Sequence, residues 1–439
     1  MKLAYGISDK PKFGQLIVFA LQQLLAIMAA TIAVPAIVGN GMSSSAALFG
    51  AGVGTLVYLL FTKFSSPVFL GSSFAFLGSM FAAFGGAAST AVGYAGLIIG
   101  AILAGLVYVF IAIIVKCVGV KWINKLMPAV VIGPTVAIIG LSLAGNAVGD
   151  LQKCFNENAN IYLCIVIGLV TFFGTMISSV YGKKFGKMIP FIIGICCGYI
   201  VAAAFTILGN CTGIDEFVII NFGLFDSMTW IPDFTFIQAF EGLSKVTGSY
   251  IATVAVAYVP VAFVVFAEHI ADHKNISSII EKDLLEDPGL HRTLLGDGVG
   301  SMVGAFFGGC PNTTYGESIG CVAISGNASV VTILATSIMA IIASFIAPFA
   351  TFLATIPNCV MGGVCIALYG FIAVSGLKMI QGADLNDNKN LFVVSVILIA
   401  GIGGLSVTFG KITITAIACA LILGIITNVV LNVKTKKAE

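Results

Sequence analysis

Apolar stretches of about 20 residues recur from one end of this chain to the other, and few charges interrupt them. Of its 439 residues 59% are hydrophobic and only 9% are charged, whereas a soluble domain is usually about one quarter charged. A run of about 20 apolar residues is long enough to cross a bilayer as a helix. The composition therefore predicts an all-α polytopic membrane protein.

The spacing of the apolar stretches predicts about 14 transmembrane segments. The first begins near Leu16 and lacks a small-residue cleavage site, so we interpret it as a span and not as a signal peptide. Segments 3, 9 and 10 are the weakest, because they are short or rich in Gly and Ser. The expected segments are 14–38, 46–64, 68–86, 92–116, 129–148, 161–181, 188–209, 247–271, 294–309, 311–326, 328–355, 359–379, 391–410 and 412–433.

The distribution of cations supports this count. With the N-terminus placed in the cytoplasm, only three of the 21 Lys and Arg residues fall outside, namely Lys153, Lys245 and Lys411. Cytoplasmic loops of membrane proteins carry an excess of Lys and Arg, and a wrong count would scramble this asymmetry. Both termini are therefore predicted to be cytoplasmic.

Other features narrow the class of protein. The net charge is +2 and no basic tract is present, so nucleic acid is not an expected partner. The 11 cysteines show no metal-ligand spacing; Cys154 and Cys211 fall in predicted external loops, which leaves a disulfide between them open. The acidic external segment 210–246 is expected at the outer surface with brief helices, and the internal segment 272–293 is expected to be a solvated connector.

An internal duplication is visible at the fifth and twelfth segments. LMPAVVIGPTVAIIG (126–140) and TIPNCVMGGVCIALYG (355–370) share Pro128/Pro357 and Gly133/Gly362 at one offset of 229 residues. Seven segments precede the external connector and seven follow it, and an odd number inverts the second copy. The expected units are a first repeat over 1–209, the connector 210–246 and a second repeat over 247–439. Many secondary transporters are built from such inverted repeats.

Two segments in corresponding places of the two halves have interrupted helical patterns. SPVFLGSSFAFLGS (66–79) contains Gly71 followed by two serines, and GGCPNTTYGESIG (308–320) contains Pro311 followed by Asn312. A broken span leaves backbone groups unpaired, which is tolerated only where protein, water or substrate satisfies them. Paired interruptions predict a binding site near the bilayer midplane.

Two intramembrane carboxylates, Glu268 and Glu317, are the strongest functional candidates. A charged side chain at the centre of the bilayer costs about 3 kcal/mol on insertion scales, so such residues are read as functional by default. Glu268 and Asp272 are spaced i,i+4 and share one helix face. Like charges so close disfavour joint ionisation, so we hypothesise that this pair holds one proton under some conditions. These residues predict a transporter.

Each of these candidates also has a structural alternative. Each glutamate could be a helix-packing residue bonded to a neighbour, and Asp272 could be solvated or paired with Lys274. His269 and His273 are expected to be orienting or interfacial, and Asp297 to be a structural residue on the cytoplasmic side. The Gly-rich runs GAGVG and GVGSMVGAFFGG are expected to permit close helix contacts.

Several motifs together resemble one family. AEHIADH (267–273), KDLLEDPGLHR (282–292) and PNTTYGESIG (311–320) resemble the nucleobase–ascorbate transporter family, and within it the branch of bacterial uracil permeases. The resemblance runs along the whole chain and implies 14 spans in two inverted repeats. It implies a core domain (spans 1–4 and 8–11, about 14–116 and 247–355) and a gate domain (spans 5–7 and 12–14, about 129–209 and 359–433). Short antiparallel strands are implied in spans 3 and 10.

The resemblance also implies a binding site. Glu268 would be the main ligand of the nucleobase ring nitrogens, and Glu317 would supply a second carboxylate. Backbone amides near Phe74 and Gly316 would meet the carbonyl oxygens. The residues that would shape the pocket are Phe74, Ala30 and Tyr315, with Tyr369 approaching from the gate domain. A homodimer in the bacterial cytoplasmic membrane is implied, with no organic cofactor.

Two positions depart from the family pattern. The Gln-His pair of span 1 is here Gln22–Gln23, and Asp272 stands where well-known members have a histidine associated with proton coupling. The expected function is uracil import by proton symport with alternating access, with Asp272 and Glu268 carrying the proton. Transport of xanthine or another purine, an uncoupled nucleobase facilitator, and Na⁺ as coupling ion stay open as alternatives. No arrangement typical of an intramembrane enzyme is present in the sequence.

Overall fold

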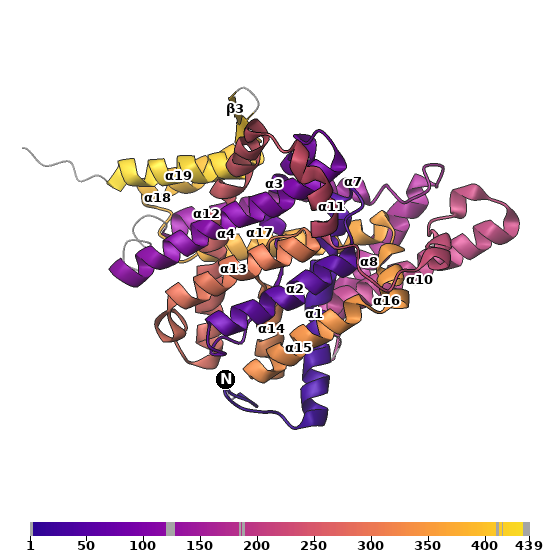
Figure 1. Ribbon diagram of the computed structural model, residues 1–439, viewed down its shortest axis with the longest axis horizontal. Coiled ribbons are helices and arrows are strands. Elements are labelled where there is room, and N and C mark those ends of the chain that lie inside the picture. The colour runs from indigo at the N-terminus through magenta and orange to yellow at the C-terminus, as the bar shows by residue number, and fades with distance from the viewer. Residues whose placement is uncertain are drawn as a thin grey trace, which may run out of the picture.

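The protein is almost entirely helical, as the composition predicted. We describe it from a computed structural model, which covers residues 3–119, 128–183, 186, 189–409, 412–414 and 416–432 (Figure 1). The helices up to residue 212 are α1 (Phe13–Val38), α2 (Ser44–Phe61), α3 (Leu77–Gly85), α4 (Thr90–Val118), α6 (Ala129–Ser142), α7 (Ala144–Asp150), α8 (Ile161–Tyr181) and α10 (Pro190–Thr212).

The second half of the chain contains further helices and most of the short elements. The helices are α11 (Thr235–Gly242), α12 (Gly248–Ile280), α13 (Leu290–Gly308), α14 (Gly316–Ser325), α15 (Val330–Ser344), α16 (Ala347–Ala354), α17 (Asn358–Ile380), α18 (Asn388–Ile402) and α19 (Ala416–Asn432). The strands are β1 (Leu70–Ser72), β2 (Asn312–Thr314), β3 (Val407–Phe409) and β4 (Ile412–Ile414). The short 3-10 helices are η1 (Phe74–Phe76), η2 (Asp215–Phe217), η3 (Phe222–Ser227) and η4 (Leu243–Lys245), and η5 (Leu285–Gly289) is a short π-helix.

Length and composition identify the membrane-crossing helices. Within the described ranges, eight helical stretches are long and apolar enough to cross a bilayer: α1, α2, α4, α6 with α7, α8, α10, α12 and α17. The bent pair α15 and α16 would make a ninth. A multi-pass helical membrane fold is therefore confirmed. The other expected segments contain shorter or more polar helices, so the count of 14 crossings stays a prediction.

The expected segment 328–355 is not one straight helix. It consists of α15 and α16, whose axes differ by 82°. Pro348 stands in the first turn of α16, where its missing N–H costs nothing, whereas it could not continue α15. The segment therefore passes the length and hydropathy test only as a bent pair, and a single crossing here stays a prediction.

The solvated connector expected over 272–293 is also wrong. Helix α12 continues to Ile280 and buries His273, Ile276 and Ile280 on one face, although its other residues there are polar. Helix α13 begins at Leu290, which is buried too. The non-helical connector is thus much shorter than predicted. The external segment 210–246 does contain the brief helices that were expected, η2, η3, α11 and η4.

The two interrupted segments pair with each other as short strands. β1 and β2 are antiparallel, with Leu70 opposite Thr314 and Ser72 opposite Asn312. The Ser73 amide donates to the Pro311 carbonyl at 2.8 Å, which extends the ladder by one residue. Backbone groups freed by the breaks thereby satisfy each other inside the protein. The strands implied in spans 3 and 10 are confirmed.

A second hairpin was missed by the sequence analysis. β3 and β4 pair antiparallel between α18 and α19, with Val407 opposite Ile414. The run VTFGKITIT has the alternating, β-branched character of a hairpin around Gly-Lys, but it was divided between two predicted spans. The external position predicted for Lys411 lies outside the described residues.

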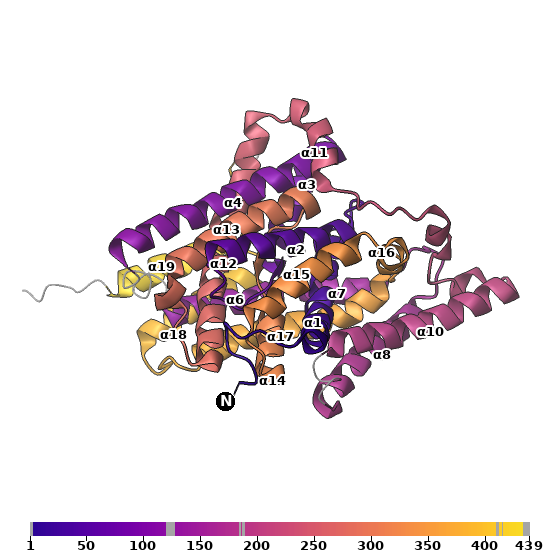
Figure 2. The same ribbon diagram turned by 60° about the horizontal axis from the view of Figure 1, so that its bottom comes forward.

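The helices form two mutually packed sets. In the first, α13 packs on α2 and α4, α15 packs on α1 and α2, and α12 packs on α4. In the second, α17 packs on α6 and α8, α10 packs on α8, and α18 packs on α19 and α6. Figure 2 shows α4, α13, α2 and α15 in one layer, with α8 and α10 extending to one side.

Glycines permit the closest helix contact in the first set. A Cβ built on Gly54 of α2 would lie 2.7 Å from the Gly300 carbonyl oxygen of α13, and a Cβ on Gly300 would lie 2.7 Å from the Gly54 oxygen. Such distances exclude any side chain, so the two backbones touch directly. The close contacts predicted for the runs GAGVG and GVGSMVGAFFGG are confirmed at this pair.

Candidate functional site

A cavity of about 430 Å³ lies where the strand pair, α12 and α14 face α6, α10 and α17. Its volume falls in the usual range for small-molecule sites. The lining residues come from both packed sets of helices: Ala26, Phe74, Ala75, Val136, Ile139, Ser179, Pro190, Phe191, Glu268, Ala271, Asp272, Asn275, Thr313, Thr314, Tyr315, Gly316, Glu317, Gly320, Cys321, Leu368, Phe371, Ile372 and Met379.

Three carboxylates face this cavity. Glu268 and Asp272 lie one turn apart on α12, and Glu317 lies in the first turn of α14. Among the described residues, Glu268 and Glu317 form no ion pair and no hydrogen bond with another side chain. A carboxylate that is half-buried and unpaired retains its full capacity to accept hydrogen bonds from a ligand. The structural alternative for the two glutamates, a bond to a neighbouring side chain, has no support in the described residues.

Asp272 is held by the strand pair. The Thr314 hydroxyl of β2 donates to Asp272 Oδ2 at 2.6 Å, which fixes this carboxylate at the edge of the cavity. Lys274 is exposed, and the two residues, both among those described, form no ion pair with each other. The alternative of a pair with Lys274 is therefore wrong.

The helix start at α14 adds donors next to Glu317. Tyr315 is the N-cap and Gly316 is the first helical residue, so the first amides of α14 have no intrahelical acceptor. An N-terminus of this kind presents N–H groups and a partial positive charge. Gly316 is exposed to the cavity. The site thus contains both acceptors and donors.

Aromatic residues border the cavity beside the strands. Phe74 follows β1 in η1 and lines the cavity. Its ring contacts Tyr369 of α17 edge-to-face, with the centroids 5.8 Å apart. The Tyr315 hydroxyl donates to the Ser72 carbonyl at 2.8 Å, so this ring is tied to β1. Phe74 can offer its face to a planar ligand.

Two of the predicted site residues lie outside the cavity wall. Ala30 is 1% exposed inside α1 and Tyr369 is 3% exposed, and neither belongs to the lining residues. Ala26, one turn before Ala30, lines the cavity in its place. Tyr369 reaches the site through Phe74.

Several lining residues were missed by sequence reasoning. Asn275 lies one helical step beyond Glu268, Ala271 and Asp272 on the same face of α12. The sequence did not indicate it as a site residue, because it lies in the segment 272–293 that was predicted to be a connector. Phe191 and Phe371 form the opposite wall. They sit in uniformly apolar helices, where no pattern separates a cavity wall from a packed or lipid-facing residue.

A smaller cavity of about 230 Å³ lies on the other side of η1. Phe74 and Ala75 line both cavities, and the smaller one is bordered by α3, α6, α12 and α19. None of its lining residues is charged. The two cavities are thus separated at Phe74.

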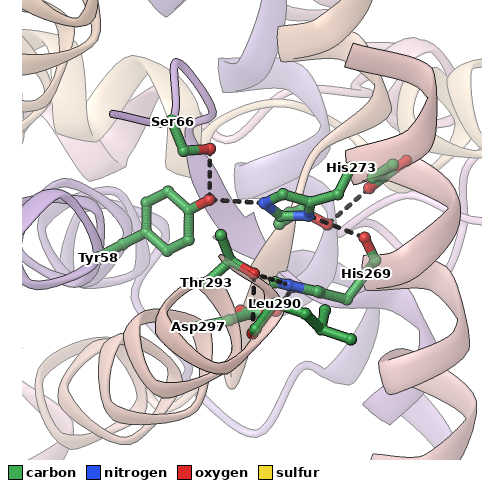
Figure 3. A network of polar contacts seen from close by, with 9 residues as sticks. Tyr58, Ser66, His269, His273, Leu290, Thr293 and Asp297 are labelled. Carbon is green, nitrogen blue, oxygen red and sulfur yellow. Dashed lines mark hydrogen bonds and ion pairs between the residues drawn. The ribbon is translucent and has the colours of Figure 1, made fainter. Parts of the chain in front are cut away.

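A buried polar network lies behind the carboxylate face of α12 (Figure 3). His269 and His273 are both 0% exposed, and they bond to Asp297 and Tyr58 respectively. The prediction that these histidines orient other groups agrees with their bonds, and Asp297 is fully buried. In the described ranges no cluster of three or more His, Cys, Asp and Glu suits a metal ion, and all 11 cysteines, Cys154 and Cys211 included, are free thiols.

Comparison with known proteins gives consistent results. The Xan_ur_permease model, described as a permease family, matches residues 14–410. The uracil permease of Bacillus caldolyticus is 38% identical over 443 residues, which is 100% of this chain and 97% of that protein. The uracil permease of Escherichia coli K12 is 35% identical over 426 residues, which is 96% of this chain and 92% of that protein.

Solved structures agree in fold alone. The transmembrane domain of the cyanobacterial bicarbonate transporter BicA superposes with a TM-score of 0.65 at 16% identity, covering 96% of this chain and 100% of that one. Murine Slc26a9, an anion transporter in the inward-facing state, gives a TM-score of 0.67 at 12% identity. The superposition covers 97% of this chain and 69% of that one. These identities carry no inference about the ligand.

Proposed function

Because the chain belongs to the xanthine/uracil permease family, we propose that it imports uracil by proton symport with alternating access. Membership makes it a transmembrane nucleobase permease and not an enzyme. The observation that supports uracil most directly is the pair of unpaired carboxylates, Glu268 and Glu317, in one cavity with the amides that begin α14.

The polar groups of this cavity complement a pyrimidine-dione ring. Uracil has two N–H donors and two carbonyl acceptors. Glu268 and Glu317 accept from the ring nitrogens in this proposal, and amides near Gly316 and Phe74 donate to the ring oxygens. Hydrogen bonds to a charged acceptor contribute about 1.5–3 kcal/mol each. Phe74 stacks on the ring in this proposal, Tyr315 and Ala26 line the wall beside it, and Tyr369 supports Phe74.

Proton coupling is proposed to involve Glu268 and Asp272. They lie one turn apart and both face the cavity, so joint ionisation is unfavourable. One proton on this pair would lower the charge of the site and allow the helices that carry it to move past the opposing set. Asp272 takes the place of the family's coupling histidine in this account. If Asp272 does not take up the proton, the protein would be an uncoupled nucleobase facilitator.

The proposed architecture is 14 spans in two inverted repeats, 1–209 and 247–439. Its support is that Pro128 and Pro357, the matched residues of the duplication, are the N-caps of α6 and α17, which pack together. The core domain would contain spans 1–4 and 8–11, and the gate domain spans 5–7 and 12–14. Both termini would be cytoplasmic, in a bacterial cytoplasmic membrane, with a homodimer through the gate domains.

Alternating access is supported by the two cavities on either side of Phe74. Rocking of the core domain against the gate domain would open one side as the other closes.

Xanthine or another purine is the second candidate substrate. A cavity of about 430 Å³ does not exclude a bicyclic ring by size. Several relatives that resemble the chain over most of its length are uracil permeases, and a putative pyrimidine permease of E. coli K12 is 31% identical. This favours a pyrimidine.

Uptake of labelled uracil tests the proposal. The chain is produced in a strain without its own uracil permease, and uptake is measured with and without a protonophore. Uptake that the protonophore abolishes is the expected result, with competition by 5-fluorouracil and not by xanthine. Absence of uracil uptake, with the protein present in the membrane, would overturn the substrate, and uptake indifferent to the protonophore would overturn the coupling.

A further inference from the structure

The buried network behind α12 links three helices through titratable side chains. His269 Nδ1 lies 2.7 Å from Asp297 Oδ2 of α13, and His269 Nε2 lies 3.0 Å from the Thr293 hydroxyl. His273 Nε2 lies 2.8 Å from the Tyr58 hydroxyl of α2. The two imidazoles, both drawn in Figure 3, are stacked. Their ring centroids are 4.0 Å apart. None of these groups lines the cavity.

The Thr293 hydroxyl can bond to two neighbours. It lies 3.1 Å from the Leu290 carbonyl and 3.0 Å from His269 Nε2. When its single hydrogen is donated to the carbonyl, the hydroxyl accepts from His269, and Nε2 carries a hydrogen in that arrangement. A neutral imidazole has only one N–H, which would leave Nδ1 as a bare lone pair facing Asp297 Oδ2.

A second hydrogen must then lie between His269 and Asp297. A bare Nδ1 facing an ionised carboxylate at 2.7 Å would place two acceptors in contact without a donor, inside a region of 0% exposure. Either Asp297 is protonated and donates to Nδ1, or His269 is an imidazolium and donates to Oδ2. In both cases the pair holds one extra proton and is neutral overall, which is the condition for burying such groups.

His273 completes the attachment of α12 on the same side. Its Nδ1 donates to the His269 carbonyl at 2.9 Å, which leaves Nε2 to accept from Tyr58. The Tyr58 hydroxyl in turn pairs with the Ser66 hydroxyl at 2.7 Å. Tyr108 of α4 also packs against this region, and its ring centroid lies 6.4 Å from that of His269. These contacts bind α12 to both α2 and α13.

The position of these bonds on α12 connects them with the cavity. His269 follows Glu268 and His273 follows Asp272, so each pair of neighbours is separated by about 100° around the helix axis. A rotation of α12 by about 20° would therefore displace a carboxylate about 6 Å from the axis by about 2 Å. The network fixes this rotation, because its bonds are short and directional.

We propose that the Asp297–His269 pair is a positioning unit of the binding site, in which the proton held between Oδ2 and Nδ1 fixes the rotation of α12 and so directs Glu268 and Asp272 into the cavity. The pair itself touches no substrate. The proposal rests on the proposed function only for its binding readout, since the geometry of Glu268 can be measured without a ligand.

Three variants of the full-length protein in detergent test this unit. Asp297→Asn retains a side-chain N–H that can donate to Nδ1 but cannot ionise. Asp297→Leu removes the donor at similar size, and Thr293→Val removes the acceptor that fixes the His269 hydrogen. Tyr108→Phe is the matched control, because it changes a neighbour of His269 without touching the pair. Thermal unfolding of each variant establishes that it is folded.

Two readouts are compared: the Kd for labelled uracil, and the extent to which a hydrophobic carbodiimide labels Glu268, measured by peptide mass spectrometry. We expect Asp297→Leu to raise the Kd about tenfold or more and to change Glu268 labelling by about threefold or more. Thr293→Val should produce smaller changes in the same direction. Asp297→Asn and Tyr108→Phe should stay within about threefold of the wild type in Kd and within about twofold in labelling.

The outcomes separate the two proposals. If Asp297→Asn fails as badly as Asp297→Leu in both readouts, or if folded Asp297→Leu and Thr293→Val both behave as the wild type, the positioning role is wrong. If the wild type does not bind uracil, the proposed substrate is wrong, and the labelling of Glu268 still decides the positioning role.

Discussion

The three carboxylates of the cavity differ in their hydrogen-bond partners within the protein. Asp272 accepts from Thr314, whereas Glu268 and Glu317 are paired with no other side chain of the described residues. An acid without a side-chain partner keeps its full capacity to accept hydrogen bonds from a ligand, whereas the hydrogen bond from Thr314 favours the ionised form of Asp272. In the proposed function the two glutamates therefore bind the base, and Asp272 shares the coupling role with Glu268.

Glu268→Gln should weaken uracil binding and leave the fold intact. The neutral amide accepts a weaker hydrogen bond than a carboxylate, and the loss of about 1–2 kcal/mol corresponds to a rise in Kd of roughly tenfold. The melting temperature should stay the same or rise, because an unpaired half-buried charge is removed. Calorimetry gives both values, with exposed Glu286→Gln as the control. An unchanged Kd would exclude Glu268 as a ligand.

Asp272→Asn should preserve the exchange of uracil across the membrane but abolish its accumulation. The amide oxygen can still accept from Thr314, so the site keeps its shape, but the side chain can no longer take up a proton. We expect exchange of labelled for unlabelled uracil to persist and protonophore-sensitive accumulation to be lost. Both are measured in the same vesicles. A variant that accumulates uracil as the wild type does would remove Asp272 from the coupling mechanism.

At the scale of elements, the broken segments position the site. β1 and β2 pair across 242 residues of chain, and their ends deliver Phe74, Tyr315 and Glu317 to one cavity. Residue composition alone predicted the two interruptions, because Gly, Ser and Pro disturb an apolar helix in recognisable ways. The strands themselves came only from the family resemblance, since three-residue strands leave no periodicity to read.

Other elements could not be predicted for physical reasons. The last turns of α12 carry polar residues around a single buried face that includes His273 and Ile276, so the segment resembles a loop by composition. The bend before α16 depends on Pro348, which is as compatible with a kinked span as with two helices. The cavity wall opposite the carboxylates is apolar. Its residues could not be predicted, because an apolar sequence does not distinguish them from packed or lipid-facing residues.

Gly71→Ala should disturb the strand pair specifically. A Cβ at this position would overlap the ring of Tyr315, whose hydroxyl is bonded to Ser72 of the same strand. We expect a loss of uracil affinity of about tenfold or more through displaced Tyr315 and Glu317. Gly78→Ala in α3 is the control, since a Cβ there meets nothing within 4 Å. Binding by both variants equal to the wild type would show that this contact does not position the site.

At the scale of the whole molecule, two packed sets of helices meet at a cavity that neither set encloses alone. The side chains of Phe74 and Ala75 separate this cavity from the smaller one beyond η1. A transporter that works by alternating access must keep one barrier closed at all times. Phe74, 9% exposed and in contact with Tyr369 of the opposing set, is the side chain best placed to form such a barrier.

Phe74→Ala should therefore uncouple the protein as well as weaken binding. Removing the ring joins the two cavities and removes a stacking surface worth about 1–3 kcal/mol for a base. The steady accumulation of uracil should fall more than the initial rate of uptake, because substrate leaks back. Phe81→Ala, which changes the lining of the smaller cavity only, is the control. An equal fall in rate and accumulation would indicate a binding defect without a barrier role.

Transport by reconstituted liposomes shows whether the two glutamates and Asp272 couple uracil transport to protons. Purified protein is placed in vesicles with an inwardly directed proton gradient and no sodium, and labelled uracil inside is followed over time. The account predicts transient accumulation above the external concentration, abolished by a protonophore and by Glu268→Gln. Uracil that only equilibrates, or accumulates solely when a sodium gradient is supplied, would contradict it.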